Sequence, residues 1–381
     1  MTATRAAERP LENIANSCAL AGQRPDYRGE RWAARGVLWD LSTVKRCRDC
    51  GRVPVTADGS VQVRANGVTV GYAGLASCGS VWLCPVCNSK IMAVRRLEVG
   101  TALAWMLGQG SVAFGTYTVR HHSAAPLRGT WKSLTACWAA LGRDKGVREA
   151  RRDLGLVGTI RPAEVTHGVN GWHPHLHPSL GFRHELTTAD VAQLQSVTVA
   201  AWVRAADRLG LSTPSAAAQD LHLVTGSRAA SDLGDYFTKA TYGPSVDSVA
   251  WESTSTQTKS RTRAEGSRTP WQLLDAVRLD GDADALDLWH QWESGSKGMR
   301  ALTWSRGLRA AAGLDVEATD EDIAAAEVGT REDAGIVVTD WSPIVANPRL
   351  GAGLLAAVGP AGNWNEGRRF ADAHGIDWRN A

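Results

Sequence analysis

Several features that mark other protein classes are missing from this chain of 381 residues. The N-terminus has no positively charged stretch followed by an apolar run, so no secretory signal is expected. No charge-free apolar stretch reaches the roughly 18 residues of a membrane span, which favours a cytoplasmic protein. The formal net charge of +3 is too small to indicate nucleic-acid binding by itself. Any basic surface must therefore come from local clustering.

Phenylalanine and cysteine are both sparse. The chain has four Phe residues against sixteen Trp, and it has seven Cys residues. So few cysteines in so long a chain do not make a disulfide scaffold, and their spacing indicates metal binding instead. The composition, 44% hydrophobic and 21% charged, is that of a globular protein with a substantial core. The length suggests roughly two or three domains.

Two CxxC pairs flank a segment with the pattern of a β-hairpin. Residues 60–72 alternate between apolar and polar side chains around Asn66-Gly67, a dipeptide typical of a tight turn. Structural zinc takes four tetrahedral ligands, and each CxxC pair supplies two thiolates from one turn. We therefore predict a structural zinc site, with no open position for water, formed by Cys47, Cys50, Cys84 and Cys87. Cys78 is a fifth candidate, which could replace one of these or be buried on its own.

The stretch Gly171-Trp172-His173-Pro174-His175-Leu176-His177 places three histidines at alternate positions. In an extended strand His173, His175 and His177 would share one face, with Trp172 and Leu176 on the other. Two imidazoles at this spacing can hold one divalent ion and leave a coordination position for a substrate oxygen. The stretch is therefore a candidate metal platform.

A third metal ligand is expected from the preceding strand. Residues 158–166 lead through a turn at 168–171 into the histidines, so Glu164 would lie on the adjacent antiparallel strand. Glu164 is the first choice of ligand, His173 the second, and His121 or His122 the third. The alternative interpretation of Glu164 is an ordinary carboxylate at the edge of a strand.

Helical periodicity over 229–241 predicts a rigid element that carries a tyrosine. Asp232, Tyr236 and Lys239 fall on one face of this helix, and apolar residues fall on another. A phenol with a pKa of about 10 is a poor nucleophile at neutral pH. A metal-polarised phosphate and the ammonium group of Lys239 would make attack by Tyr236 feasible. A tyrosine on a helix otherwise belongs more often to the core or to the surface.

In combination these motifs resemble those of the rolling-circle replication initiators of actinobacterial plasmids, which belong to the HUH endonuclease superfamily. The HUH signature corresponds to His175-Leu176-His177, and the YxxK motif to Tyr236–Lys239. The cysteine block 78–87 precedes a Thr-x-x-His pattern, Thr118 to His121, and further agreement comes from 302–308. The resemblance runs from about residue 47 to residue 314. One departure is Pro178, which predicts that the histidine strand ends or bends there, because proline cannot donate to a ladder.

The resemblance implies a site-specific DNA nicking and joining enzyme. His175, His177 and a third polar ligand would hold Mg²⁺ or Mn²⁺ on the scissile phosphate. Tyr236 would attack phosphorus, leaving a free 3′-OH primer and a 5′-phosphotyrosine link, and Lys239 would stabilise the developing charge.

Termination of such a reaction needs a second cleavage. The resemblance implies that Asp232, with Asp235 as the alternative, activates water for that step. Tyr242 lies six residues after Tyr236, or about 240° around a helix. The two phenols would not share a face, so a single catalytic tyrosine is expected.

DNA contacts are expected around the histidines, from Trp172, Arg161 and Arg183. Single strands bind through backbone charge and stacking surfaces, which these side chains would supply. The implied partners are single-stranded and duplex plasmid origin DNA, with a host helicase and polymerase. Two other interpretations stay open: an HUH strand transferase of the transposase or relaxase type, and a non-catalytic zinc-containing DNA-binding protein.

The predicted fold class is α+β. It comprises an HUH endonuclease core with a central antiparallel sheet flanked by helices, an N-terminal zinc ribbon and a helical C-terminal region. We expect an N-terminal arm over 1–45, a zinc-ribbon region over 46–95, the nicking domain over 96–252, a basic linker or loop over 253–268 and a helical C-terminal domain over 269–381. Periodicity predicts further helices over 89–107, 131–141, 188–209, 271–277, 283–292 and 299–312, and strands over 111–119 and 220–224.

Overall fold

The computed structural model describes residues 27–224 and 267–381, and it confirms the α+β class with two antiparallel sheets flanked by helices. These residues divide between two compact units. The first comprises 27–41, 48–78 and 325–381, and the second comprises 42–47, 79–224 and 267–324. Each unit is thus built from segments that the sequence-based division assigned to different domains. Within the described ranges, no helix has both the length and the apolar character needed to cross a membrane.

The first unit is built on a four-stranded sheet in the order β10-β9-β1-β2. The predicted hairpin is confirmed, because β1 and β2 pair across Asn66-Gly67, where Gly67 adopts a φ of +87°. The elements of this unit are α1 (Tyr27–Leu41), β1 (Val61–Ala65), β2 (Val70–Ala73), a 3₁₀ turn (Arg331–Asp333), β9 (Ala334–Val338), α13 (Ser342–Ala346), α14 (Pro348–Val358), α15 (Trp364–Ala373) and β10 (Trp378–Arg379).

Both chain ends contribute more to this unit than the sequence suggested. Residues 27–41 of the expected arm form α1, which packs on α14, with Trp32 lying against Gly351. The expected helical C-terminal region also carries two strands of this sheet, β9 and β10. Buried apolar residues of β9, such as Ile336, pair with β1, and this tertiary pairing is invisible to local periodicity.

The second unit contains a six-stranded sheet in the order β5-β4-β6-β3-β7, with β8 paired to β4. Its elements are α3 (Pro85–Gln109), β3 (Ser111–Thr116), α4 (Leu127–Leu141), α5 (Lys145–Asp153), β4 (Leu156–Gly168), β5 (Gly171–Leu176), β6 (Ser179–Phe182), α6 (Thr188–Arg208), a 3₁₀ turn (Ala216–Ala218), β7 (Asp220–Leu223), α9 (Pro270–Asp280), α10 (Ala283–Gly295), β8 (Leu302–Trp304), α11 (Leu308–Ala311) and α12 (Asp320–Ala325). A further short helix, α2, spans Lys45–Asp49.

Strand β4 organises this sheet. Its second half pairs with β5 and its first half with β6, so β5 and β6 continue one another along the same long strand. The interruption falls at His177 and Pro178, where a strand end or bend was predicted. The register sets Glu164 opposite His175, which confirms that the carboxylate and the histidines lie on adjacent antiparallel strands.

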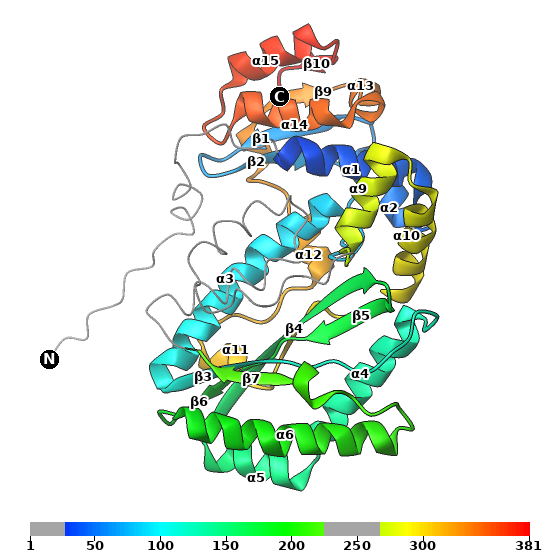
Figure 1. Ribbon diagram of the computed structural model, residues 1–381. Coiled ribbons are helices and arrows are strands. Elements are labelled where there is room, and N and C mark those ends of the chain that lie inside the picture. The colour runs from blue at the N-terminus through cyan, green and yellow to red at the C-terminus, as the bar shows by residue number, and fades with distance from the viewer. Residues whose placement is uncertain (1–26, 225–266) are drawn as a thin grey trace, which may run out of the picture. The chain divides into compact units, whose positions relative to one another are not determined.

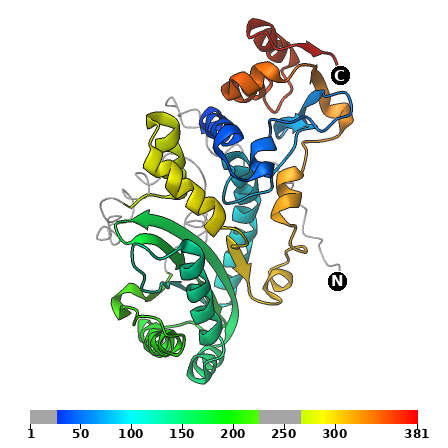
Figure 2. The same cartoon turned by 90° about the vertical axis from the view of Figure 1, so that its right-hand side faces the viewer.

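The two faces of the second sheet bury different cores. On one face, α3 packs Leu103 and Met106 against Phe114 and Ile160. On the other, α6 packs Leu194 against strand residues such as Phe182, and α4 and α5 lie on the same side. Figures 1 and 2 show this layering, with the curved strands between α3 and the group α4, α5 and α6.

The helix predicted over 299–312 is wrong. Residues 302–304 form β8 instead, with Trp304 opposite Ile160 of β4, and a short helix, α11, begins only after Gly307. Gly307 has a φ of +82°, a conformation that would break a continuous helix. Pairing with β4 outweighs the helical spacing of the apolar residues.

Candidate functional site

Glu164, His175 and His177 converge on the α3 face of the second sheet. One ligand atom from each lies within 4.8 Å of the others, close to the separation of ligands that share one ion. The carboxylate comes from β4, His175 from β5, and His177 from the break that follows β5. Two imidazoles and one carboxylate, all on neighbouring strands, make a group able to hold a divalent metal ion.

His177 is held from two sides. Its Nε2 lies 3.1 Å from Oε2 of Glu164, and its Nδ1 lies 3.2 Å from Oγ1 of Thr116. The ring stacks on Phe114, with the centroids 5.9 Å apart and an angle of 4° between the planes. When Nε2 binds a metal, the ring proton must sit on Nδ1, where the Thr116 hydroxyl oxygen can accept it. Thr116 therefore supports the candidate ligand His177. The sequence signal for this role was the alternation of side chains along β3, which puts Thr116 on the sheet face that carries the histidines.

His175 fits a metal ligand best. It is half-buried, and burial lowers the pKa of its imidazole to about 3, which keeps the ring neutral and able to donate a lone pair. Its Nδ1 is buried and has no hydrogen-bond partner. A buried nitrogen without a hydrogen-bond partner destabilises the fold. A metal-binding role for the ring would explain why a histidine stands here and not an apolar residue.

His173 is already engaged elsewhere. Its Nδ1 lies 2.7 Å from Nε2 of His121, and its Nε2 lies 3.1 Å from Oγ1 of Thr118. His121 in turn contacts the carbonyl oxygen of Asn170 through Nδ1 at 2.9 Å. His173 and His121, two of the alternatives to Glu164 as third ligand, thus have their nitrogens engaged in hydrogen bonds. The remaining alternative, His122, is exposed.

The cysteine cluster differs by one residue from the predicted set. Four buried cysteines have their sulfur atoms within 4.8 Å of one another: Cys50, Cys78, Cys84 and Cys87. Cys78 thus takes the place expected for Cys47, which is buried in α2 but lies outside this group. CxxC spacing favoured Cys47, and only the folded chain brings Cys78 to the other three.

The residues predicted to carry the chemistry lie outside the described part of the chain. Tyr236, Lys239, Asp232, Asp235 and Tyr242 all fall within 225–266. Their expected roles remain predictions. So does the basic linker expected over 253–268, except for its last two residues.

The three candidate DNA contacts have different surroundings. Trp172 is 2% exposed and stacks on Trp292 with centroids 5.7 Å apart, so its indole is part of the core and not a stacking platform. Arg161 is half-buried over the ring of Trp138, and burial lowers the pKa of its guanidinium to about 10. Arg183 is exposed.

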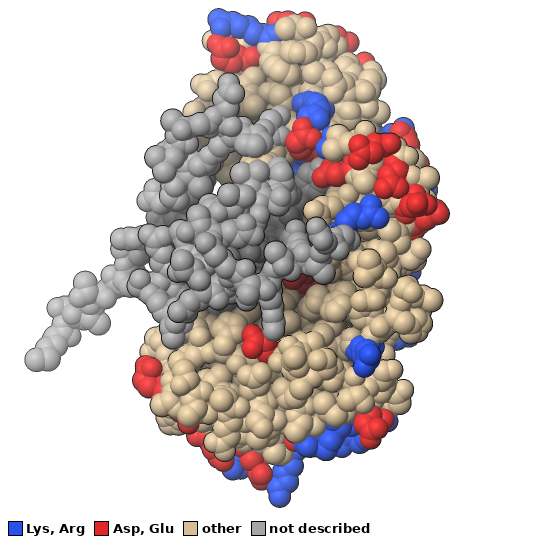
Figure 3. All heavy atoms as spheres, viewed as in Figure 1, with Lys and Arg blue, Asp and Glu red and all other residues tan. Residues whose placement is uncertain are grey.

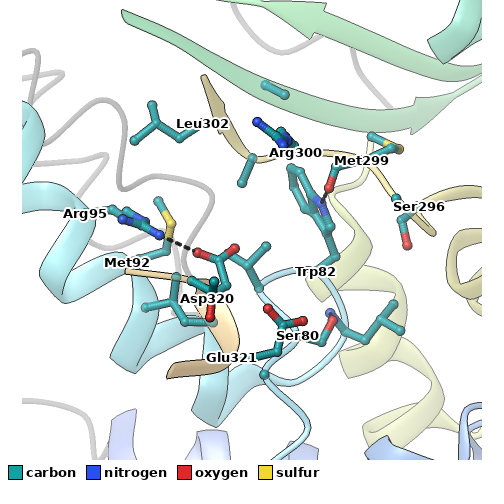
Figure 4. Close-up of a pocket in the computed structure, with 18 of the residues that line it drawn as sticks. Ser80, Trp82, Met92, Arg95, Ser296, Met299, Arg300, Leu302, Asp320 and Glu321 are labelled. Carbon is teal, nitrogen blue, oxygen red and sulfur yellow. Dashed lines mark hydrogen bonds and ion pairs between the residues drawn. The ribbon is translucent and has the colours of Figure 1, made fainter. Parts of the chain in front are cut away.

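A separate cavity of about 860 Å³ lies in the second unit (Figure 4). Its floor includes Trp82, whose Nε1 donates to the Met299 carbonyl oxygen at 2.9 Å. At its side, Arg95 donates to Oδ1 of Asp320, also at 2.9 Å. Both acidic and basic side chains line it, so it lacks the concentrated positive charge that a DNA backbone needs.

Acidic side chains gather over α9 and α10 on the face drawn in Figure 3. These two helices and the turn between them carry five aspartates: Asp275, Asp280, Asp282, Asp284 and Asp287. Phosphate groups are repelled by such a surface, so DNA is not expected to lie along it.

Comparison with known proteins found two relatives in Streptomyces. The chain is 29% identical over 360 residues to "Protein rep" of Streptomyces lividans, covering 76% of this chain and 77% of the relative. It is also 35% identical over 130 residues to a "Neomycin resistance protein" of Streptomyces cyanogenus, of which it covers only 30%. No family model matches the chain, and no solved structure matches it. The match to the first relative over three quarters of both chains confirms the expected resemblance to an actinobacterial Rep protein.

Proposed function

We propose that the protein initiates rolling-circle plasmid replication by nicking and rejoining one strand of the double-strand origin. The observation that carries the proposal is the convergence of Glu164, His175 and His177 on one sheet face. The similarity to a Rep protein over most of the chain agrees with it. The substrate is single-stranded and duplex plasmid origin DNA, and a host helicase and polymerase would extend the primer.

The proposed reaction is a transesterification at phosphorus. Tyr236 Oη attacks the scissile phosphate, the P–O3′ bond breaks, and the 3′ oxygen leaves with a proton as the primer hydroxyl. The product is a 5′-phosphotyrosine on Tyr236. Glu164, His175 and His177 would hold Mg²⁺ or Mn²⁺, which would supply Lewis-acid polarisation of the phosphate. Lys239 stabilises charge on the phosphate oxygens, and Asp232 or Asp235 activates water for the second cleavage.

The decisive experiment detects the covalent intermediate. The protein is incubated with Mn²⁺ and labelled single-stranded origin DNA, and the adduct is resolved on a denaturing gel. We expect Tyr236→Phe to abolish the adduct, while the matched control Tyr242→Phe keeps it. An adduct that survives Tyr236→Phe but disappears in Tyr242→Phe would move the nucleophile to Tyr242. Absence of any adduct from the unaltered protein with all origin fragments would refute the nicking activity.

We further propose that Cys50, Cys78, Cys84 and Cys87 bind a structural zinc ion. Four buried thiolates leave no position for a substrate, and soft sulfur ligands favour zinc over magnesium or manganese. Metal analysis of purified variants separates this set from the one that the CxxC spacing predicted. Cys78→Ser should lose the zinc, and Cys47→Ser should retain one ion per chain. Loss of zinc from Cys47→Ser with retention in Cys78→Ser would restore the set expected from spacing.

A further inference from the structure

Thr118 and His121 form the Thr-x-x-His pattern, and the proposed metal chemistry gives neither residue a role. We infer that His121 is a positioning residue that orients His173, and that His173 in turn holds the ring of the metal ligand His175. This inference rests on the proposed metal site.

The hydrogen bonds around His173 have a single consistent direction when both rings are neutral. The Asn170 carbonyl oxygen can only accept, so Nδ1 of His121 carries the proton and Nε2 of His121 is a lone pair. Nδ1 of His173 must then donate to His121, over 2.7 Å. That leaves a lone pair on Nε2 of His173, which can accept from the Thr118 hydroxyl over 3.1 Å, in competition with the Pro174 carbonyl oxygen at 3.3 Å from that hydroxyl.

Both imidazoles are partly buried, and the hydrogen bonds run in one line from Thr118 through His173 and His121 to Asn170. The chain of donors therefore ends on a backbone carbonyl and begins on a hydroxyl. While this chain is intact, the two nitrogens of His121 and Nδ1 of His173 are engaged in hydrogen bonds.

Packing then links this chain to the metal ligand. The His173 ring lies against that of His175, with centroids 4.1 Å apart and 33° between the planes. His177 lies on the far side of His175 at 5.7 Å. Because Nδ1 of His175 has no hydrogen-bond partner, its ring is oriented by its two neighbours. A fixed His173 therefore fixes the direction of the lone pair that His175 offers to an ion.

Substitution of His121 should weaken metal binding without touching a ligand. His121→Phe keeps a flat ring but leaves the Nδ1–H of His173 without an acceptor, so His173 should turn and release His175. We expect Mn²⁺ affinity to fall about tenfold, the lower end of the effect known for residues that support metal ligands. His121→Gln retains a side-chain acceptor and should recover most of the affinity.

The test is calorimetric titration of the full chain with Mn²⁺, in the absence of DNA, together with thermal unfolding of each variant. The exposed neighbour His122 supplies the matched control, and His122→Phe should bind Mn²⁺ as the unaltered protein does. His175→Ala serves as the reference for loss of the site. If His121→Phe does not fold, Thr118→Val breaks the same chain from its other end and should lower the affinity in the same way.

Failure of the inference is distinct from failure of the proposed function. If the unaltered protein and His175→Ala do not differ in Mn²⁺ binding, the metal site itself is refuted. If they differ but His121→Phe binds like the unaltered protein, only the positioning role is refuted. Equal weakening by His121→Gln and His121→Phe would also refute it. An increase in affinity in His121→Phe would instead identify His173 as a ligand that the chain holds back.

Discussion

The four-stranded sheet of the first unit and the histidine-bearing sheet of the second are both antiparallel, but they treat buried polar groups differently. In the first unit, Tyr72 Oη donates to the Gly351 carbonyl oxygen at 2.7 Å, and Trp341 Nε1 donates to the Gly51 carbonyl oxygen at 3.1 Å. The rings of Trp32, Tyr72 and Trp341 meet edge to face. Each polar tip ends on the backbone.

The second sheet has a buried ring nitrogen that ends on neither backbone nor side chain. Nδ1 of His175 is buried without a partner, and the Glu164 carboxylate faces His177. The first unit also has buried polar atoms without a hydrogen-bond partner, Nε and Nη2 of Arg35 and Nε of Arg368. Each guanidinium lies over an indole ring, Arg35 at 3.8 Å from the Trp32 centroid and Arg368 at 5.5 Å from that of Trp378, which compensates it. The comparison teaches that a buried polar group points to a ligand when neither backbone nor aromatic ring satisfies it.

The largest expected effect separates the two sheets by function. His175→Ala should lower Mn²⁺-dependent nicking by roughly a thousandfold or more, because phosphate polarisation is lost. Its free energy of unfolding should change little, since the removed imidazole has an unsatisfied nitrogen. Tyr72→Phe should do the reverse, costing about 1 kcal/mol of stability with activity retained. Nicking rates and urea unfolding check both variants, and equal activity in the two would break the comparison.

A second prediction concerns the tight packing around Gly51 in the first unit. Gly51 has a φ of +64°, and a Cβ there would meet the Arg35 guanidinium, which is itself 4% exposed. Gly51→Ala should therefore destabilise the protein by about 2–4 kcal/mol, from left-handed backbone strain plus overpacking. Gly59 has a φ of +72° but open space around it, so Gly59→Ala should cost only about 1–2 kcal/mol. Equal destabilisation of the two, measured by urea unfolding, would mean that Arg35 moves aside.

A third prediction is a dependence of stability on pH that belongs to the second sheet. Burial lowers the pKa of His173 to about 4 and of His175 to about 3, below the value of about 6.5 in the unfolded chain. The unfolded state therefore binds more protons between these values, and stability is lost as pH falls below about 6.5. Each ring contributes a slope of up to about 1.4 kcal/mol per pH unit.

This dependence is measured by urea unfolding of the metal-free protein between pH 7 and pH 5. His175→Phe removes one of the two titrating rings and should flatten the slope. His122→Phe makes the same replacement at an exposed position and is the matched control for it. A slope unchanged by His175→Phe would show that other groups cause the loss.

Local patterns in the sequence predicted a large part of this arrangement. Alternation predicted the hairpin around Asn66-Gly67 and the shared face of the histidines, because side chains on a strand repeat every second residue. The same alternation placed Glu164 beside His175 across a short turn. Periodicity failed at 302–304, where apolar residues pair with β4, and at β9, which reaches the sheet from the other end of the chain.

By itself the sequence determined which side chains share a face, since that follows from the geometry of one strand or one turn. Only the tertiary structure decided how each was used. Packing of distant segments buried Trp172 under Trp292, brought Cys78 in place of Cys47, and gave His173 a partner in His121. The physical reason is that a hydrogen-bond donor, a lone pair or an exposed ring can be occupied by a residue far away in the chain. Local spacing carries no information about that neighbour.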